Sequence, residues 1–229
     1  MLAGLAARQH GSRGCLLGEG FAADERAILD LLVDVALGLA RVAPSIKKLS
    51  MKRVALFGPE STGKTQLAQH LAAHFQAPVI AEYAREFWDQ HGAITLANIP
   101  AIAREQWRRE DAAAAAAPRL LLCDTEALTT VLWSDLLYGT CPAQIRTEAE
   151  RRASGYTLYL LLDIDVPFAP DPQRSFPDLA DRARCFNLWR EALDQRQLPY
   201  KLIRGAWPTR QQQAIAAINQ LWSKTGAAR

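Results

Sequence analysis

The residues with the clearest chemistry are GPESTGKT at positions 58 to 65, which have the pattern of a phosphate-binding loop. Gly58 and Gly63 allow backbone turns that a side chain would forbid, so successive N–H groups can point inward as a cradle for an anion. Lys64 can reach the β- and γ-phosphates of ATP, and Thr65 can ligate Mg²⁺. We therefore predict ATP and Mg²⁺ as ligands and assign the phosphates to these loop residues, with Lys64 catalytic: Gly58, Glu60, Ser61, Thr62, Gly63, Lys64 and Thr65.

The segments around this loop have the form that the motif requires. The apolar stretch RVALF at 53–57 reads as a buried strand, and KTQLAQHLAAHF at 64–75 reads as a helix. A metal-binding loop of this kind needs an acidic residue at the end of a neighbouring strand, and Asp124 closes the apolar stretch 119–124. We predict Thr65 and Asp124 as the metal ligands. The alternative for Asp124 is that it caps the helix that follows.

A small-molecule kinase also needs a base for the hydroxyl group that accepts the phosphoryl group. Glu82 ends a predicted strand at 77–82, at the sheet edge where ligands bind in open α/β folds. Arg85 follows one helical turn later and could steady a phosphate or the substrate. We assign the acceptor hydroxyl to Glu82, although Asp124 could also be the base. The alternative is a surface ion pair between Glu82 and Arg85, which would contribute little.

The middle of the chain is rich in aromatic residues, so a planar base could stack there, and a cationic ring would gain cation–π energy. Gln106 and Glu110 lie four residues apart on a predicted helix at 99–117 and so share a face. The alternatives are packing in the core for the aromatic residues and a solvated helix face for Gln106. The predicted substrate-binding residues are Tyr83, Arg85, Trp88 and Gln106.

A long connection at 163–186, rich in proline, aspartate and arginine, is typical of a lid. Arg174, Arg182 and Arg184 are candidate phosphate clamps in it, because a planar guanidinium suits a pair of phosphoryl oxygens. We expect Arg174 to be catalytic and Arg182 to contact the ATP phosphates. The alternative is a solvated, charged loop.

Strands and helices alternate along the chain after residue 52. This alternation predicts an α/β fold like that of P-loop nucleoside kinases: a three-layer sandwich with a five-stranded, mostly parallel sheet, helices on both faces and a lid. Strands are expected at 53–57, 77–82, 119–124, 157–163 and 200–204. Helices are expected at 64–75, 84–92, 99–117, 126–139, 182–197 and 209–222.

The composition describes an ordinary soluble protein of 229 residues, with a formal net charge of only +3. Nothing in this balance indicates a nucleic-acid or membrane partner. The four cysteines have no CxxC spacing, so neither a zinc site nor a disulfide framework is expected, and we predict the cytoplasm as the location. The apolar stretch at 27–42 carries Asp30 and Asp34 and is too short to span a bilayer.

Two domains are expected. Residues 1–50 read as a partly disordered extension with one amphipathic helix at about 24–42, and residues 51–229 as the kinase domain. MKRVALFG at 51–58 resembles the opening of a compact domain, so an alternative is that Met51 is the true start.

Several segments in this order resemble the nicotinamide riboside kinase domain of bacterial NAD-salvage proteins. They are VALFGPESTGKTQLAQHLA, AEYAREF, IAREQWRRED, CDTEALTTVLWSDLLYG, YLLLDIDVPFAPDPQR and LIRG, spread over residues 52–222. The resemblance implies transfer of the γ-phosphoryl group of ATP to the 5′-hydroxyl of nicotinamide riboside. The sequence departs from the family pattern at DPQR in the lid, where a glycine would be more typical. About fifty residues precede the loop, too few for a nucleotidyltransferase domain, and they contain no HxGH-type signature, so neither adenylylation nor DNA-binding repression is expected.

Two other functions stay open from the sequence. One is a kinase of another nucleoside or small metabolite, and the other is an ATP-binding sensor with little turnover. The expected partner is a small-molecule nucleoside, with a homo-oligomer possible.

Overall fold

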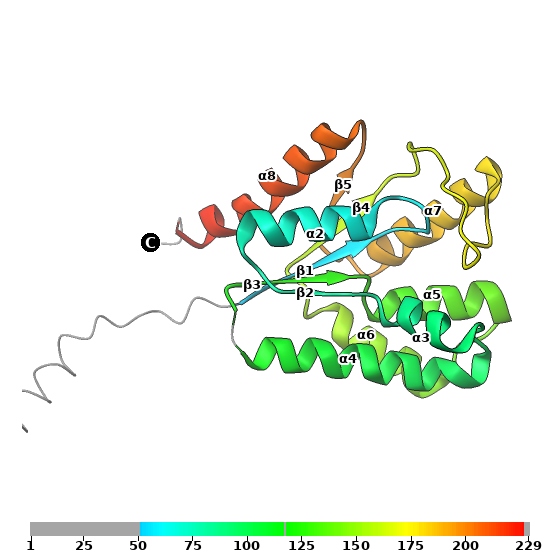
Figure 1. Ribbon diagram of the computed structural model, residues 1–229. Coiled ribbons are helices and arrows are strands. Elements are labelled where there is room, and N and C mark those ends of the chain that lie inside the picture. Colours follow the sequence, from blue (N-terminus) through cyan, green and yellow to red (C-terminus); the bar gives the residue numbers. More distant parts are fainter. Residues whose placement is uncertain (1–50, 117, 227–229) are drawn as a thin grey trace, which may run out of the picture. The chain divides into compact units, whose positions relative to one another are not determined.

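A single parallel sheet organises the computed structural model, which describes residues 51–116 and 118–226. Its strand order is β2-β3-β1-β4-β5, and every pairing in it is parallel. Parallel neighbours need crossover connections, and helices supply them here (Figure 1). The strands are β1 (Lys52–Phe57), β2 (Val79–Ile80), β3 (Leu120–Asp124), β4 (Leu158–Leu162) and β5 (Tyr200–Ile203).

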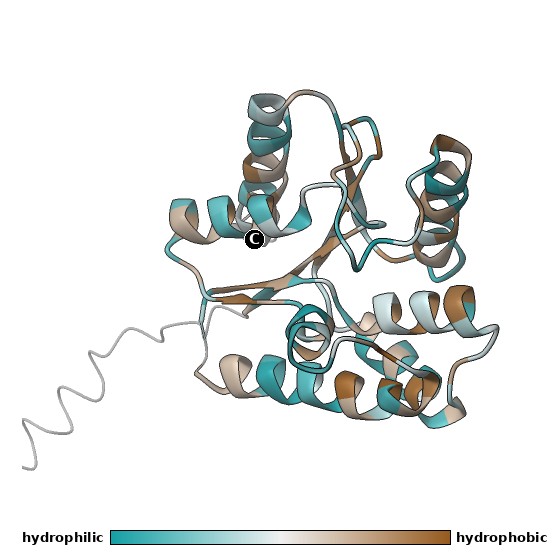
Figure 2. Ribbon diagram, turned by 45° about the vertical axis from the view of Figure 1, so that its right-hand side comes forward, coloured by the Kyte–Doolittle hydropathy of each residue, from teal (hydrophilic) through white to brown (hydrophobic). Residues whose placement is uncertain are grey.

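Helices cover both faces of the sheet, as Figure 1 shows for α2 and α8 on one face and α4, α5 and α6 on the other. They are α2 (Lys64–Phe75), α3 (Tyr83–His91), α4 (Ile99–Ala115), α5 (Ala127–Tyr138), α6 (Ala143–Ala153), α7 (Leu179–Gln195) and α8 (Trp207–Gly226), with a 3₁₀ turn at Leu96–Asn98. Because side chains alternate along a strand, Val54 and Leu56 of β1 pack toward α2 and α8, while Ala55 and Phe57 pack toward α4, α5 and α7. The strands of the sheet interior are mostly hydrophobic (Figure 2), and their charged residues, Lys52, Arg53, Asp124 and Lys201, lie at strand ends or in the edge strand β5.

The predicted fold is confirmed, with local differences. Helix α6 was not expected, although Ile145, Ala149 and Ala153 recur at helical spacing and form its buried face. Strand β2 has only two residues, because Pro78 precedes it without an N–H group and the chain turns into α3 at Glu82. The extension 1–50 and its predicted helix lie outside the described residues.

All five strands end at one edge of the sheet, and this edge positions the polar residues of interest. The phosphate-binding loop follows β1, Glu82 follows β2, Asp124 closes β3 and the predicted lid follows β4. Strand β1 lies between β3 and β4. The chain passes from β1 to β2 and β3 on one side, and then crosses to β4 and β5 on the other side. Ligands of open α/β sheets bind at such a switch point.

Candidate active site

The phosphate-binding loop has a backbone that only particular residues allow. Gly58 has φ +141°, and a Cβ atom on it would lie 2.9 Å from the carbonyl oxygen of Leu162. Gly63 has φ +85° and is the N-cap of α2. Thr62 Oγ1 and Lys64 Nζ both donate hydrogen bonds to the Pro59 carbonyl, at 3.0 and 2.8 Å. These two hydrogen bonds within the loop fix its conformation at the N-terminus of α2. Backbone N–H groups at a helix N-terminus suit an anion.

A buried arginine that the sequence reasoning missed also holds this loop. Arg210 of α8 is fully buried and donates to the carbonyl of Thr62 at 3.0 Å. It also donates to the carbonyls of Gly205 and Asp163, both at 2.9 Å, and pairs with the Asp165 carboxylate. One guanidinium therefore ties the loop to the segments after β4 and β5. Nothing in the polar local sequence TRQQQ signals this burial.

Thr65 and Asp124 lie together, as the metal-site prediction requires. Thr65 Oγ1 donates to Asp124 Oδ2 at 2.6 Å, and Asp124 is only 1% exposed. The other oxygen, Oδ1, is buried and has no partner among the described residues. Burial raises the pKa of Asp124, while Lys64 and Thr65 oppose that shift. A hydroxyl beside a carboxylate with a free oxygen is an all-oxygen donor set that fits Mg²⁺.

The alternative role of Asp124 as a helix cap is wrong. Helix α5 is capped instead by Glu126, whose carboxylate accepts hydrogen bonds from the N–H groups of Leu128 and Thr129 at 2.9 and 3.2 Å. Glu126 is almost fully buried, and this burial raises its pKa to about 8. Sequence reasoning missed this residue, because Glu is not among the residue types that usually cap helices.

Glu82 lies on the wall of a cavity of about 600 Å³, close enough to Lys64 for the two charges to shift each other's pKa. Burial raises the pKa of Glu82, and the Lys64 ammonium opposes the shift. Burial lowers the pKa of Lys64, which the Glu82 and Asp124 carboxylates oppose. Asp124 does not line the cavity. A carboxyl group with a raised pKa that faces the cavity is suited to act as a base.

Arg85 does not pair with Glu82, so the alternative of a surface ion pair between them is wrong. Arg85 lines the cavity and pairs instead with Asp171 of the lid segment at 2.8 Å. Trp88 and Gln106 line the cavity as well. Tyr83 does not: its ring lies under the Arg109 guanidinium, 4.4 Å from ring centroid to Cζ, and meets Phe87 edge-on.

The walls that α3, α4 and α5 contribute to the cavity are largely apolar and aromatic. Polar side chains among them are few. The apolar lining residues of these helices and of the segments before them are Trp88, Ile94, Ile99, Ile102, Trp133, Leu137 and Tyr138. The uncharged polar ones are Gln106, Thr125, Thr129 and Thr130, and Arg85 of α3 is charged. Thr129 Oγ1 is buried and has no partner among the described residues. Such a wall suits a planar ring that is anchored by few hydrogen bonds.

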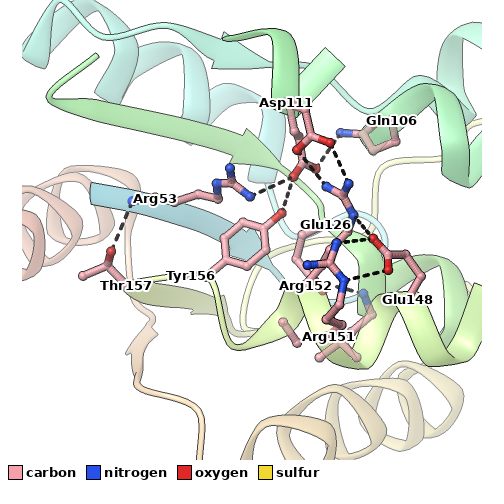
Figure 3. A network of polar contacts seen from close by, with 12 residues as sticks. Arg53, Gln106, Asp111, Glu126, Glu148, Arg151, Arg152, Tyr156 and Thr157 are labelled. Atoms are coloured by element: carbon pink, nitrogen blue, oxygen red, sulfur yellow. Dashed lines mark hydrogen bonds and ion pairs between the residues drawn. The ribbon is translucent and has the colours of Figure 1, made fainter. Parts of the chain in front are cut away.

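Gln106 and Glu110 face the interior, so a solvated helix face is the wrong interpretation of them. Gln106 Oε1 accepts from the N–H of Tyr83 at 2.8 Å, and its amide nitrogen donates to Glu110 at 3.4 Å. Glu110 is fully buried, accepts from the Tyr156 hydroxyl at 2.6 Å and lies 3.9 Å from Arg53. Figure 3 shows Gln106, Arg53 and Tyr156 gathered in this network. Gln106 therefore holds the first residue of α3, directly after Glu82.

The three candidate arginines of the lid have different surroundings. Arg174 lines the cavity and donates to Ser61 Oγ at 3.4 Å and to the Ala169 carbonyl. Arg182 is buried, donates to the Val166 carbonyl at 3.0 Å and does not line the cavity. Arg184 is exposed and does not line it either. The prediction of a phosphate contact by Arg182 is therefore corrected. Arg182 lies in the first turn of α7, and its side chain points to the backbone at the start of the lid, at Val166.

Comparison with known proteins decides the family. Residues 53–210 match the family described as AAA domain, which is more than half of the chain. The chain belongs to the AAA domain family. It is also 24% identical over 164 residues to the trifunctional NAD biosynthesis/regulator protein NadR of Escherichia coli (strain K12), and 24% over 170 residues to that of Salmonella typhimurium (strain LT2). These stretches are 69% and 72% of this chain but 40% and 41% of the relatives, so the chain spans about 40% of the curated relatives it matches.

Solved structures with the same fold include several P-loop kinases. A crystal structure of NadR protein in complex with NR superposes with a TM-score of 0.60 at 20% identity, over 75% of this chain and 51% of that chain. Thymidylate kinase from Ehrlichia chaffeensis gives 0.56 at 13% identity, over 74% and 99%. The predicted resemblance to the kinase domain of NAD-salvage proteins and the predicted P-loop kinase fold are both confirmed. Among the described residues, no helix is both long and apolar enough to cross a membrane.

Proposed function

We propose that this protein phosphorylates the 5′-hydroxyl of nicotinamide riboside with ATP and forms nicotinamide mononucleotide in the cytoplasm. The observation that carries the proposal is the position of Glu82: a carboxyl group with a raised pKa faces the same cavity as Lys64 and the phosphate-binding loop. A phosphate donor and a hydroxyl acceptor can therefore meet between them. The similarity to NadR, and the NadR structure in complex with NR, supports nicotinamide riboside as the acceptor.

The charges around the cavity favour a nucleoside over a nucleotide as the acceptor. Its cationic lining residues are Lys64, Arg85, Arg174 and Arg210. Arg210 is occupied by backbone carbonyls and Asp165, and Arg85 is paired with Asp171. Lys64 and Arg174 belong to the loop and the lid. No cluster of free cations is thus left for a second phosphate among the described residues, whereas Trp88 and Trp133 line the cavity with aromatic rings, which attract a cationic pyridinium ring.

The residues of the chain divide the work of an in-line transfer. Lys64 and the loop N–H groups hold the phosphates of ATP, and Thr65 and Asp124 would hold Mg²⁺. When bound, the metal ion neutralises the charge that develops on the phosphate oxygens. Glu82 orients the acceptor hydroxyl and takes its proton late in the reaction. Arg174 approaches the transferring group from the lid, which keeps water out.

The test is Glu82→Gln, with Glu86→Gln as a matched control. Glu86 lies one turn further along α3, pairs with Arg109 and does not line the cavity. We expect Glu82→Gln to lower kcat for nicotinamide riboside by about 10²-fold or more, as for loss of a general base, with little change in ATP affinity. Glu86→Gln should keep wild-type turnover. Unchanged turnover in Glu82→Gln would move the base elsewhere.

A further inference from the structure

One side chain of the phosphate-binding loop holds the lid. Glu60 Oε1 accepts hydrogen bonds from two consecutive backbone N–H groups of the lid, those of Ser175 and Phe176, at 2.8 and 2.7 Å. Hydrogen bonds from N–H groups to a carboxylate are stronger than those between neutral groups. Lid residues more than a hundred positions along the chain are thus fastened directly to the loop.

The segment that Glu60 holds carries Arg174, the lid arginine that lines the cavity. Arg174 immediately precedes Ser175, so the position of its backbone follows from the two bonds to Glu60. Ser61, the next residue of the loop, accepts from the N–H of Ala169 at 2.8 Å and from Arg174 at 3.4 Å. Glu60 and Ser61 together set where the arginine stands over the phosphate site.

The same segment reaches the opposite wall of the cavity. The ring of Phe176 stacks on Trp133 of α5, with centroids 6.1 Å apart and planes inclined by 11°. Trp133 lines the cavity on the side proposed for the acceptor. The lid is also joined to α3, because Asp171 pairs with Arg85, and Gln173 donates to Asp89 at 3.2 Å. The lid therefore bridges the phosphate loop and the acceptor wall.

Glu60 places a carboxylate in the phosphate-binding loop, so another interaction must offset its electrostatic cost. A carboxylate in a loop that holds phosphates repels them, and a neutral side chain would fill the same space without this cost. Burial raises the pKa of Glu60, while the hydrogen bonds from Phe176 and Ser175 oppose the shift, as do the charges of Lys64 and Arg174. The bonds to the lid are an interaction that a side chain without an acceptor oxygen could not make here.

We propose that Glu60 is a positioning residue that latches the lid, so that the phosphoryl group passes to the acceptor and not to water. The role rests on the proposed kinase function. With the latch made, Arg174 faces the cavity, Phe176 packs on the cavity-lining Trp133, and water is excluded from the reacting groups. With the latch lost, the loop still binds ATP, but the lid opens more often and hydrolysis competes with transfer.

The first experiment compares Glu60→Ala with Glu60→Gln and with Glu86→Ala as a control outside the lid. The readout is the ratio of free phosphate released to nicotinamide riboside phosphorylated, at saturating ATP. We expect Glu60→Ala to raise this ratio by about tenfold, since two hydrogen bonds are lost. Gln keeps an oxygen that can accept from both N–H groups, so Glu60→Gln should stay nearer the wild type, and Glu86→Ala should match it. A wild-type ratio in Glu60→Ala would overturn the proposal.

A second experiment reads the latch without any activity. Trypsin cleaves after arginine, and the bond between Arg174 and Ser175 lies within the latched segment. Cleavage of the full-length protein at this bond is monitored by mass spectrometry. We expect its rate to be about tenfold higher in Glu60→Ala than in the wild type. Ser61→Ala, which removes the second anchor, should accelerate it less. Equal cleavage rates in wild type and Glu60→Ala would refute the latch even if the kinase is active. If Glu60→Ala is cleaved faster but the wild-type protein transfers phosphate to no acceptor, the latch is supported and the proposed kinase function is refuted.

Discussion

Replacing Gly58 by alanine tests how the sheet shapes the phosphate-binding loop. Gly58 has φ +141°, a backbone angle that residues with a side chain rarely adopt. The Cβ atom of an alanine here would lie 2.9 Å from the Leu162 carbonyl oxygen and 3.4 Å from the Leu162 nitrogen. These neighbours are backbone atoms of β4, which is paired on both sides, and they cannot swing aside. The loop must therefore move, or the strand must.

Gly139→Ala is the matched control for the size of this effect. Gly139 also has a positive φ, +70°, at the end of α5, but a Cβ atom there would meet nothing within 4 Å. The control measures the backbone cost alone, about 1–2 kcal/mol in the free energy of unfolding. Gly58→Ala adds the close contact, which by analogy with overpacked cores costs about 1–3 kcal/mol more.

Urea unfolding of both variants measures the difference, and titration with a non-hydrolysable ATP analogue measures the consequence for the loop. We expect Gly58→Ala to be the less stable variant and to bind the analogue about tenfold or more weakly, because displaced N–H groups no longer converge on the phosphates. Gly139→Ala should bind it like the wild type. The reasoning is refuted if the two variants are equally stable and bind the analogue equally well.

Three further predictions concern the charged and polar groups of the site. Lys64→Ala should remove nearly all phosphoryl transfer while circular dichroism shows an intact fold; substantial turnover would contradict the role of the loop. Thr65→Val should raise the Mg²⁺ concentration needed for half-maximal activity, because the hydroxyl beside Asp124 is lost; an unchanged Mg²⁺ requirement would argue against this pair as the metal site. Burial raises the pKa of Glu126 to about 8, so between its ordinary pKa and about 8 the folded chain holds a proton that the unfolded chain has lost. The free energy of unfolding should therefore fall as pH rises from 5 to 8, and Glu126→Gln should flatten this slope; an equal slope in both proteins would contradict the shift.

The parts of the site that the sequence predicts well are those encoded locally. The glycines and the lysine of the loop lie within eight residues, and the apolar runs that end in Glu82 and Asp124 announce strand ends. Once the sheet is parallel, these ends must meet at one edge, so Thr65 and Asp124 come together from positions 59 residues apart. The fold and the arrangement of the central residues thus follow from periodicity and one motif.

The residues that the sequence does not reveal act through distant contacts. Arg210 meets the carbonyl of Thr62 across 148 positions, and the lid bonds of Glu60 span 115 and 116. An arginine that is buried by backbone carbonyls looks the same in sequence as one on the surface, which is also why Arg182 was assigned to phosphate. Tyr83 was placed in the pocket because it is aromatic, but its face is covered by Arg109. The packing of α3 on α4 decides the orientation of this ring.

The proposed activity is tested by phosphoryl transfer from ATP, with Mg²⁺, to a panel of nucleosides that includes nicotinamide riboside. Products are identified by mass spectrometry, and the site of phosphorylation is determined by phosphorus NMR. We expect nicotinamide riboside 5′-phosphate as the main product, and nearly none from Glu82→Gln. Transfer only to another nucleoside would contradict the proposed substrate, and ATP binding without transfer to any acceptor would contradict the kinase itself and favour a sensor.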